Sequence, residues 1–95
     1  MSLPLYITDS YEKQAIPTDG ASVTPSDSAA LANNGILFIG SGGTLVCNLI
    51  SYISSNSPSS GGLTFTNIAN GTLLFINVGQ VCSTGTTCTG INVLY

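Results

Sequence analysis

The sequence predicts an all-β protein, built as a small single-domain β-sandwich or barrel with an extended N-terminal arm. Short apolar runs recur about every ten residues from Ile36 onward, and turns rich in Gly and Asn separate them. The apolar residues before Ser28 show no sustained helical period. The length of 95 residues allows one domain with a thin core, because so short a chain buries only about 60–65% of its unfolded surface.

Residues 1–22 are predicted to form the arm, and residues 23–95 the all-β domain. All five charged residues lie before Ser28; they are Asp9, Glu12, Lys13, Asp19 and Asp27. The arm also carries the apolar side chains of Leu5, Tyr6, Ile7 and Tyr11. These side chains are costly to leave in water, so we expect the arm to pack on another surface rather than remain a frayed terminus.

The first elements of the domain are a turn and a short strand. Thr24–Leu31 contains a proline and is expected to form a turn, followed by at most one helical turn that Ser26 or Asp27 caps. Ile36–Ile39 is apolar on both faces, as a central strand would be. A glycine-rich turn at Ser41–Gly43 is expected to follow it.

The middle of the chain predicts a long strand and then a polar loop. Thr44–Ile53 alternates, with Leu45, Cys47 and Leu49 on one face, which is typical of a strand. The nine residues Ser54–Gly62 are polar and show no periodicity, so they are expected to form a loop.

The last third of the chain predicts three more strands. Leu63–Ile68 and Leu73–Val81 flank Asn70–Gly71, a pair typical of a two-residue hairpin turn. A second turn or a bulged irregular strand is expected at Ser83–Thr87. Ile91–Tyr95 is expected to close the chain as its last strand.

The composition excludes several classes of function. The chain has no His, which removes His-based catalytic triads and imidazole metal sites. Its single cation, Lys13, cannot neutralise the phosphates of a nucleic acid or hold the chain on an anionic membrane. The longest apolar runs have four residues, whereas a membrane-spanning helix needs about 20. No signal peptide opens the chain, which favours synthesis in a cytoplasm.

Three motifs resemble functional sites but lack their chemistry. Gly40–Gly43 frames a serine with glycines, but no His is present to serve as its base. Thr18–Gly20 holds the residues of an aspartic-protease motif in the wrong order. The carboxylates of the arm lack the converging loop that Ca²⁺ requires. We therefore predict no enzymatic activity, no cofactor and no metal.

The cysteines and threonines have structural interpretations. Cys47, Cys82 and Cys88 are expected to be free buried thiols, and a disulfide between Cys82 and Cys88 is the alternative. Zinc is not expected, because a structural site needs about four ligands. The threonine-rich strand faces hold Thr64, Thr66 and Thr86. Such faces bind ice or sugars in some proteins, but more often they are solvated or buried against neighbouring subunits.

Several segments occur together in a characteristic order. They are Val23–Ser28, Leu37–Gly40 with Gly42–Leu45, Leu63–Ile68 with Gly71–Leu74, and finally Val81, Thr84–Thr87, Ile91, Leu94 and Tyr95. Over roughly residues 22–95 the set resembles a family of small structural proteins of tailed phages and gene transfer agents, which are head-spike base or capsid decoration (cement) proteins. The sequence differs from the family at Cys88, where the family usually shows Ala.

The resemblance implies a non-enzymatic virion protein that binds the outer capsid surface as a symmetric homo-oligomer and stabilises the shell. Its partners would be the major capsid protein, further copies of itself in a homotrimer or homopentamer, and a spike fibre protein. It would be made in the host cytoplasm and located on the capsid exterior. The arm residues expected to contact the capsid or a neighbour are Leu5, Tyr6, Ile7 and Tyr11. The candidates for the oligomer interface are Thr64, Thr66, Thr86, Leu94 and Tyr95.

The alternative function is a receptor- or glycan-binding module of a phage fibre. In that case the polar loop Ser54–Gly62 would contact sugars. Sugar sites generally use exposed aromatic side chains, and Tyr52 is the one aromatic residue that flanks this loop. Binding to glycans without affinity for capsids would favour this alternative.

Overall fold

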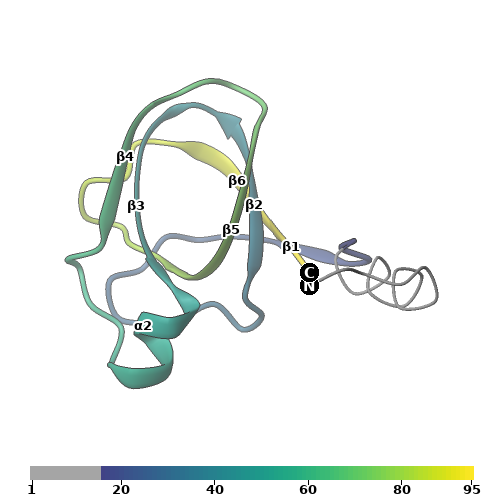
Figure 1. The fold of residues 1–95 in the computed structure, drawn as a ribbon. Helices are drawn as coiled ribbons and strands as arrows, with labels where there is room; N and C mark the ends of the chain where they lie inside the picture. Colours follow the sequence, from purple (N-terminus) through teal and green to yellow (C-terminus); the bar gives the residue numbers. More distant parts are fainter. Residues whose placement is uncertain (1–15) are drawn as a thin grey trace, which may run out of the picture.

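The computed structural model describes residues 16–95, which form one antiparallel sheet of six strands (Figure 1). The elements are β1 (Gly20–Ser22), β2 (Gly35–Ser41), β3 (Gly43–Leu49), α2 (Ile50–Ser55), β4 (Leu63–Ile68), β5 (Thr72–Val81) and β6 (Thr89–Leu94). Their order across the sheet is β1-β6-β2-β5-β3-β4. Figure 1 shows the sheet curled around a common interior, as in a barrel, with β1 and β4 as its edge strands. The predicted all-β, single-domain fold is confirmed.

The core lies inside this curl and is built by alternation along the strands. Leu37 and Ile39 of β2 are fully buried, whereas Ile36 and Phe38 on the opposite face are only half-buried. The same alternation places Leu74 and Ile76 of β5 against the core. The buried cluster consists of Leu37, Ile39, Leu45, Cys47, Val78, Val81, Cys88, Ile91 and Val93.

Two short connections between strands pack against each other at one end of the sheet. The backbone N–H of Gly42, between β2 and β3, donates to Asn70 Oδ1 at 2.6 Å. The N–H of Gly71, between β4 and β5, donates to the carbonyl of Ile39 at 2.7 Å. A Cβ at Gly42 would overlap the backbone carbonyl of Ile68, so only glycine fits there.

The turn predicted at Asn70–Gly71 is present, but the strands that flank it are not paired with each other. Both β4 and β5 pair with β3, which lies between them in the sheet. The predicted hairpin is therefore wrong. Gly42 lies against Ile68 at the end of β4, so β3, which begins at the next residue, runs beside β4. The turn therefore connects two strands that are separated in the sheet by β3.

The strand predicted over Thr44–Ile53 ends at Leu49, and α2 follows it. Ile50 and Ile53 lie three residues apart on one face of the helix, and both pack on Gly79 of β5. Gly79 is the extra residue of a bulge in the pairing of β3 with β5. A Cβ at Gly79 would lie 3.0 Å from Ile53 Cγ1, so this glycine provides the space that the helix occupies.

A buried amide joins three segments of the chain beside α2. Gln80 is 0% exposed, and its Nε2 donates to the carbonyls of Ser26 at 2.8 Å and Ser59 at 3.0 Å. Its Oε1 accepts from Asn48 Nδ2 at 2.8 Å and from the N–H of Ser59 at 3.2 Å. These hydrogen bonds hold the loop after α2 and the chain before β2 to β3 and β5. The buried donor and acceptor atoms of the Gln80 amide all have partners.

Residues 23–34 have no regular secondary structure, and Val23 and Leu31 among them pack against the core. The N–H groups of Val23, Ser26 and Leu31 donate to carbonyls of β6 and β5. Asp27 caps no helix here. Its carboxylate accepts from the N–H groups of Ser83 and Thr84 at 2.9 and 3.0 Å, and from the Thr84 hydroxyl. β1, within the stretch assigned to the arm, pairs with β6 at one edge of the sheet.

The edge strand β4 contains a bulge. Leu45 of β3 pairs with Phe65 and Gly43 pairs with Ile68, so β4 has one residue more than its partner in this interval. Asn67 takes up that residue with a φ of 59°, in the left-handed region that Asn tolerates better than most residues.

The hydrogen bonds of Asp27 predict a dependence of stability on acid. They hold the pKa of its carboxyl below the ordinary value of 3.8, with the Thr84 hydroxyl as the largest cause. The ionised Asp27 carboxylate therefore contributes to the free energy of unfolding. This stabilisation is fully present above the pKa of the unfolded state and is lost as the pH falls through the lower pKa of the folded state. We expect the unfolding midpoint in urea to fall as the pH is lowered below about 5, and to fall less in Asp27→Asn.

Thr84→Val is the companion variant, because it removes the hydroxyl that donates to the Asp27 carboxylate. That variant should also show a smaller acid dependence than the wild type. Equal slopes in the wild type and Asp27→Asn would contradict the assigned role of Asp27.

Candidate functional site

The outer face of β6, β2 and β5 is apolar and lacks a covering layer among residues 16–95. Phe75 of β5 is 77% exposed and Leu73 is 42% exposed. Ile36 of β2 and Leu94 of β6 lie beside each other in the strand register and are half-buried. Several large apolar side chains exposed next to each other, as Phe75 and Leu73 are, often indicate an interaction surface.

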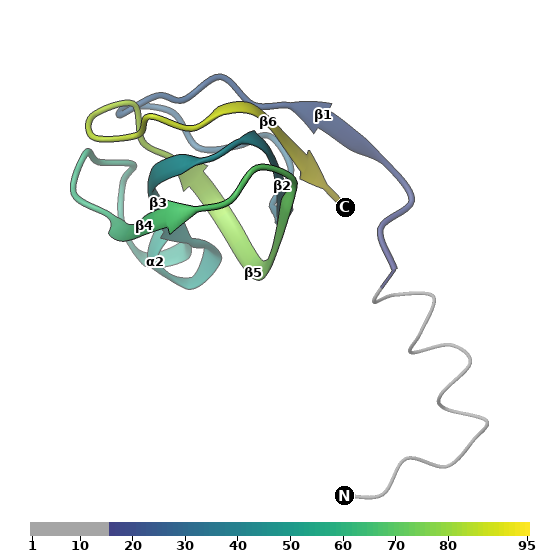
Figure 2. The ribbon, with the colours of Figure 1, turned by 90° about the horizontal axis from the view of Figure 1, so that it is seen from above.

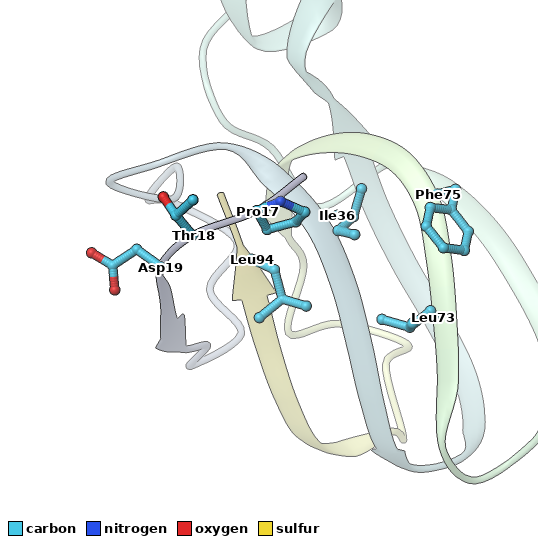
Figure 3. Close-up of a pocket in the computed structure, with 7 residues that line it drawn as sticks. All are labelled: Pro17, Thr18, Asp19, Ile36, Leu73, Phe75 and Leu94. Carbon is cyan, nitrogen blue, oxygen red and sulfur yellow. The ribbon is translucent and has the colours of Figure 1, made fainter. Parts of the chain in front are cut away.

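These side chains line an open groove of about 450 Å³ (Figure 3). Its lining residues are Pro17, Thr18, Asp19, Ile36, Leu73, Phe75 and Leu94. In Figure 3 the Leu73 and Phe75 side chains stand on β5, and Pro17 and Leu94 stand on the opposite side, with Ile36 between. The Asp19 carboxylate points away from the apolar side chains, so the groove has an apolar floor and one anionic group at its rim.

A bulge in β5 positions Phe75 in this groove. Gly35 of β2 pairs with Val78 and Leu37 pairs with Leu74, so β5 has two residues more than β2 in this interval. The insertion includes Phe75, whose side chain is turned outward. The groove therefore depends on this bulge in β5, the strand that lies between β2 and β3.

A second hollow, of about 370 Å³, lies beside α2 and the start of β4. Tyr52 lines it and is 39% exposed, and Leu63 lines it and is 52% exposed. The Tyr52 hydroxyl lies 3.4 Å from Ser59 Oγ in the following loop. The hollow combines an aromatic ring with polar loop atoms, which is the chemistry considered above for a sugar site.

The structure distributes the predicted interface residues over different parts of the sheet. Thr64 and Thr66 are exposed on the edge strand β4, and Leu94 lines the groove on β6. The Thr86 hydroxyl accepts from the N–H of Val46 at 3.0 Å, so it stabilises β3 within the chain. Tyr95 packs against the core, and its carbonyl accepts from the N–H groups of residues 18 and 19. No single patch contains all five residues, and their roles in an oligomer stay predictions.

The predicted arm contacts Leu5, Tyr6, Ile7 and Tyr11 lie outside the described residues. The described chain begins at Ile16, which is 62% exposed, and Pro17 then lines the groove. The arm therefore joins the domain at one wall of the groove.

Leu73, Phe75 and Ile36 were not predicted as surface residues. Alternation along Leu73–Val81 places Leu74, Ile76 and Val78 on one face, which the structure packs against the core, but the opposite face of the same strand is also apolar. An apolar run on both faces is typical of a strand between two layers. Because the described residues supply no second layer, the outer apolar residues were the available signal for a surface that needs a partner.

The three cysteines are free and buried, as predicted. Burial raises the pKa of the Cys47 thiol to about 11, with a smaller effect from the nearby Cys82. Burial is also the main cause that raises the pKa of Cys82 and Cys88. Within residues 16–95, no group of three or more His, Cys, Asp or Glu side chains is placed to hold a metal ion.

We expect the folded protein to react slowly with a thiol-specific disulfide reagent at pH 8, because thiolates are the reactive form and these thiols are buried. Unfolding in urea should release all three thiols at once. The measurement is the absorbance of the released reagent over time in both states. Rapid reaction of one thiol in the folded protein would contradict its burial, and release of fewer than three thiols on unfolding would contradict the unpaired state.

No helix in the described part of the chain is long and apolar enough to cross a membrane.

No family model matches the chain, and no curated protein matches it. Among solved structures, it is similar to a chain of the structure described as "Capsid of native GTA particle computed with C5 symmetry", where GTA denotes a gene transfer agent. The match has a TM-score of 0.64 and 29% sequence identity, and it covers 84% of each chain. Fold and sequence thus both support a relation to the capsid proteins of phages and gene transfer agents.

Proposed function

We propose that the chain is a non-enzymatic virion structural protein that binds the outer surface of a capsid as a symmetric homo-oligomer. It would serve as a decoration protein or as the base of a head spike. The observation that carries this proposal is the similarity to a chain of a gene-transfer-agent capsid, at 29% identity over 84% of both chains. A fold alone does not define a function, so the surface of this chain must support the same conclusion.

The surface supports it in two ways. Residues 28–95 carry no charged side chain, whereas small soluble domains usually keep a mixed charged surface. The groove on the outer sheet face exposes Phe75 and Leu73 to solvent. Both features suit a protein whose neutral faces are covered by identical copies and by the shell.

The mechanism would be burial of surface. Each subunit would add contacts to the major capsid protein and to its neighbours, and stable contacts of this kind bury about 800 Å² per partner. Head-to-tail contacts that close into a ring match the three-fold or five-fold positions of a shell. The summed burial would oppose the outward pressure on the capsid.

The test uses particles of the phage or transfer agent that encodes the chain, with and without its gene. We expect the chain to sediment with washed wild-type particles and to appear on the outer surface in cryo-EM maps, at three-fold or five-fold positions. Particles from the deletion strain should lose this density and release their contents at lower temperature. Absence of the chain from washed particles, despite its presence in the lysate, would contradict the proposal.

The hollow beside Tyr52 supports the glycan-binding module as a second candidate, because it places a half-exposed ring next to a polar loop. A glycan array with the purified chain tests it. Binding that Tyr52→Ala abolishes, in a protein that does not associate with particles, would favour this function. Particle association without glycan binding would exclude it.

A further inference from the structure

The groove on the outer face of the sheet needs an occupant. Phe75, at 77% exposed, and Leu73, at 42% exposed, lie together in it, and burial of their apolar surface against a partner would be favourable. Its one charged lining residue is Asp19, whose carboxylate is at the rim. The groove is therefore suited to an extended apolar segment with a positive charge near one end.

Residues 1–15 of the chain have this composition. They contain the apolar cluster Leu5, Tyr6 and Ile7, then Tyr11, and then Lys13, the only cation of the protein. They are followed by Ile16 and then by Pro17, which lines the groove. Both the apolar content and the single positive charge thus complement the groove and its Asp19.

We propose that residues 5–11 of one subunit pack into the groove of a neighbouring copy, so that exchanged arms hold the oligomer together. This inference rests on the proposed function, because it requires neighbouring copies, and it names the surface through which they associate. Lys13 of the inserted arm then lies near Asp19 at the rim of the groove that receives it.

The order of residues in the arm favours insertion into a neighbour over insertion into its own groove. Glu12, Lys13 and Gln14 lie only three to five residues before Pro17, which lines the groove wall. An arm folded back into its own groove would place this polar run against the apolar floor, where charges are costly to desolvate. An arm that enters from another subunit brings its apolar part to the floor and leaves the polar run at the rim.

The arm is also long enough to reach a neighbour. Fifteen extended residues span about 50 Å, whereas a small domain is about 30 Å across. If each subunit gives its arm to the next, the contacts are head-to-tail and close into a ring of defined size. Figure 2 shows the chain before β1 at the edge of the sheet rather than in its interior.

Complementation between two full-length variants tests this arrangement. One variant carries Leu5→Asp and Ile7→Asp in the arm, and the other carries Phe75→Asp in the groove, an exposed site where the fold should tolerate a charge. Each variant alone should be monomeric by size-exclusion chromatography with light scattering at micromolar concentration. The mixture should form a 1:1 complex, because it supplies one intact arm and one intact groove.

Ala30→Asp is the control, since Ala30 is exposed in the segment before β2 and lines neither the groove nor the hollow beside α2. This variant should assemble like the wild type. Assembly of Phe75→Asp alone, or two variants that remain monomeric after mixing, would overturn the exchange of arms.

Engineered cysteines identify which chain fills the groove. A protein with Ile7→Cys and Phe75→Cys, treated with oxidised glutathione as the two-electron oxidant, should form disulfide-linked chains of doubled or higher mass, while the three native thiols stay buried. A link within one chain, which leaves the mass of a monomer, would overturn insertion into a neighbour. These experiments need no capsid, so their failure is distinguishable from absence of the protein from particles.

Discussion

Replacement of Gln80 by methionine is expected to lower the free energy of unfolding by about 3–5 kcal/mol. The change removes both donors and the acceptor that Gln80 provides to Ser26, Ser59 and Asn48. Each buried polar partner left unsatisfied costs about 1–3 kcal/mol. Methionine keeps the volume of the side chain, so the formation of a cavity contributes little to the loss.

The measurement is the urea midpoint by circular dichroism at fixed protein concentration. Because small domains are stable by about 5–15 kcal/mol, the variant should be close to unfolding at room temperature. Asn34→Leu is the control, since the Asn34 side chain donates a hydrogen bond to Asn77 at the exposed surface. It should change stability by less than about 1 kcal/mol. A wild-type midpoint for Gln80→Met would show that the buried amide does not join the segments as described.

Gly42→Ala is expected to destabilise the protein by about 3 kcal/mol or more. The new Cβ would overlap the backbone carbonyl of Ile68 and crowd Ala69, and neither is a flexible side chain that can move aside. The connections β2–β3 and β4–β5 would have to separate, which breaks the hydrogen bond from the N–H of Gly42 to Asn70 Oδ1.

Gly61→Ala is the matched control for Gly42→Ala. A Cβ at Gly61 meets no atom within 4 Å, so the alanine should be neutral or stabilise by up to about 1 kcal/mol through the unfolded state. Thermal unfolding monitored by circular dichroism compares the two variants. Equal midpoints for Gly42→Ala and Gly61→Ala would contradict the close packing of the two connections.

Most of the strands were predictable, because their signals are local. Leu63–Ile68 matches β4 at both ends, since alternation and flanking turn residues are present in the sequence itself. The helix α2 was not predictable, because Ile50 and Tyr52 continue the alternation of the preceding strand. The residue that decides the structure is Gly79, about 30 positions away, whose missing side chain makes room for Ile50 and Ile53.

The pairing of strands and the groove depend on the same kind of distant contact. Asn70–Gly71 is correctly predicted as a turn. Whether the two strands that it connects pair with each other depends on β3, whose position is set by Gly42 in another segment. Leu94 was predicted at an interface and lines the groove, whereas Phe75 was not recognised. Its exposure results from a bulge in β5 and from the absence of a second layer among residues 16–95, and neither follows from the spacing of apolar residues.

The bulge at Asn67 opposes pairing of the open edge of β4 with a second copy of the protein. An open strand edge pairs readily with the same edge of a second molecule, and lysine or other charged side chains are one common protection against this. β4 has no such charge, but the left-handed backbone at Asn67 interrupts its row of N–H and C=O groups. Protection by backbone shape is not screened by ions, so resistance to fibre formation should be the same in dilute and concentrated salt.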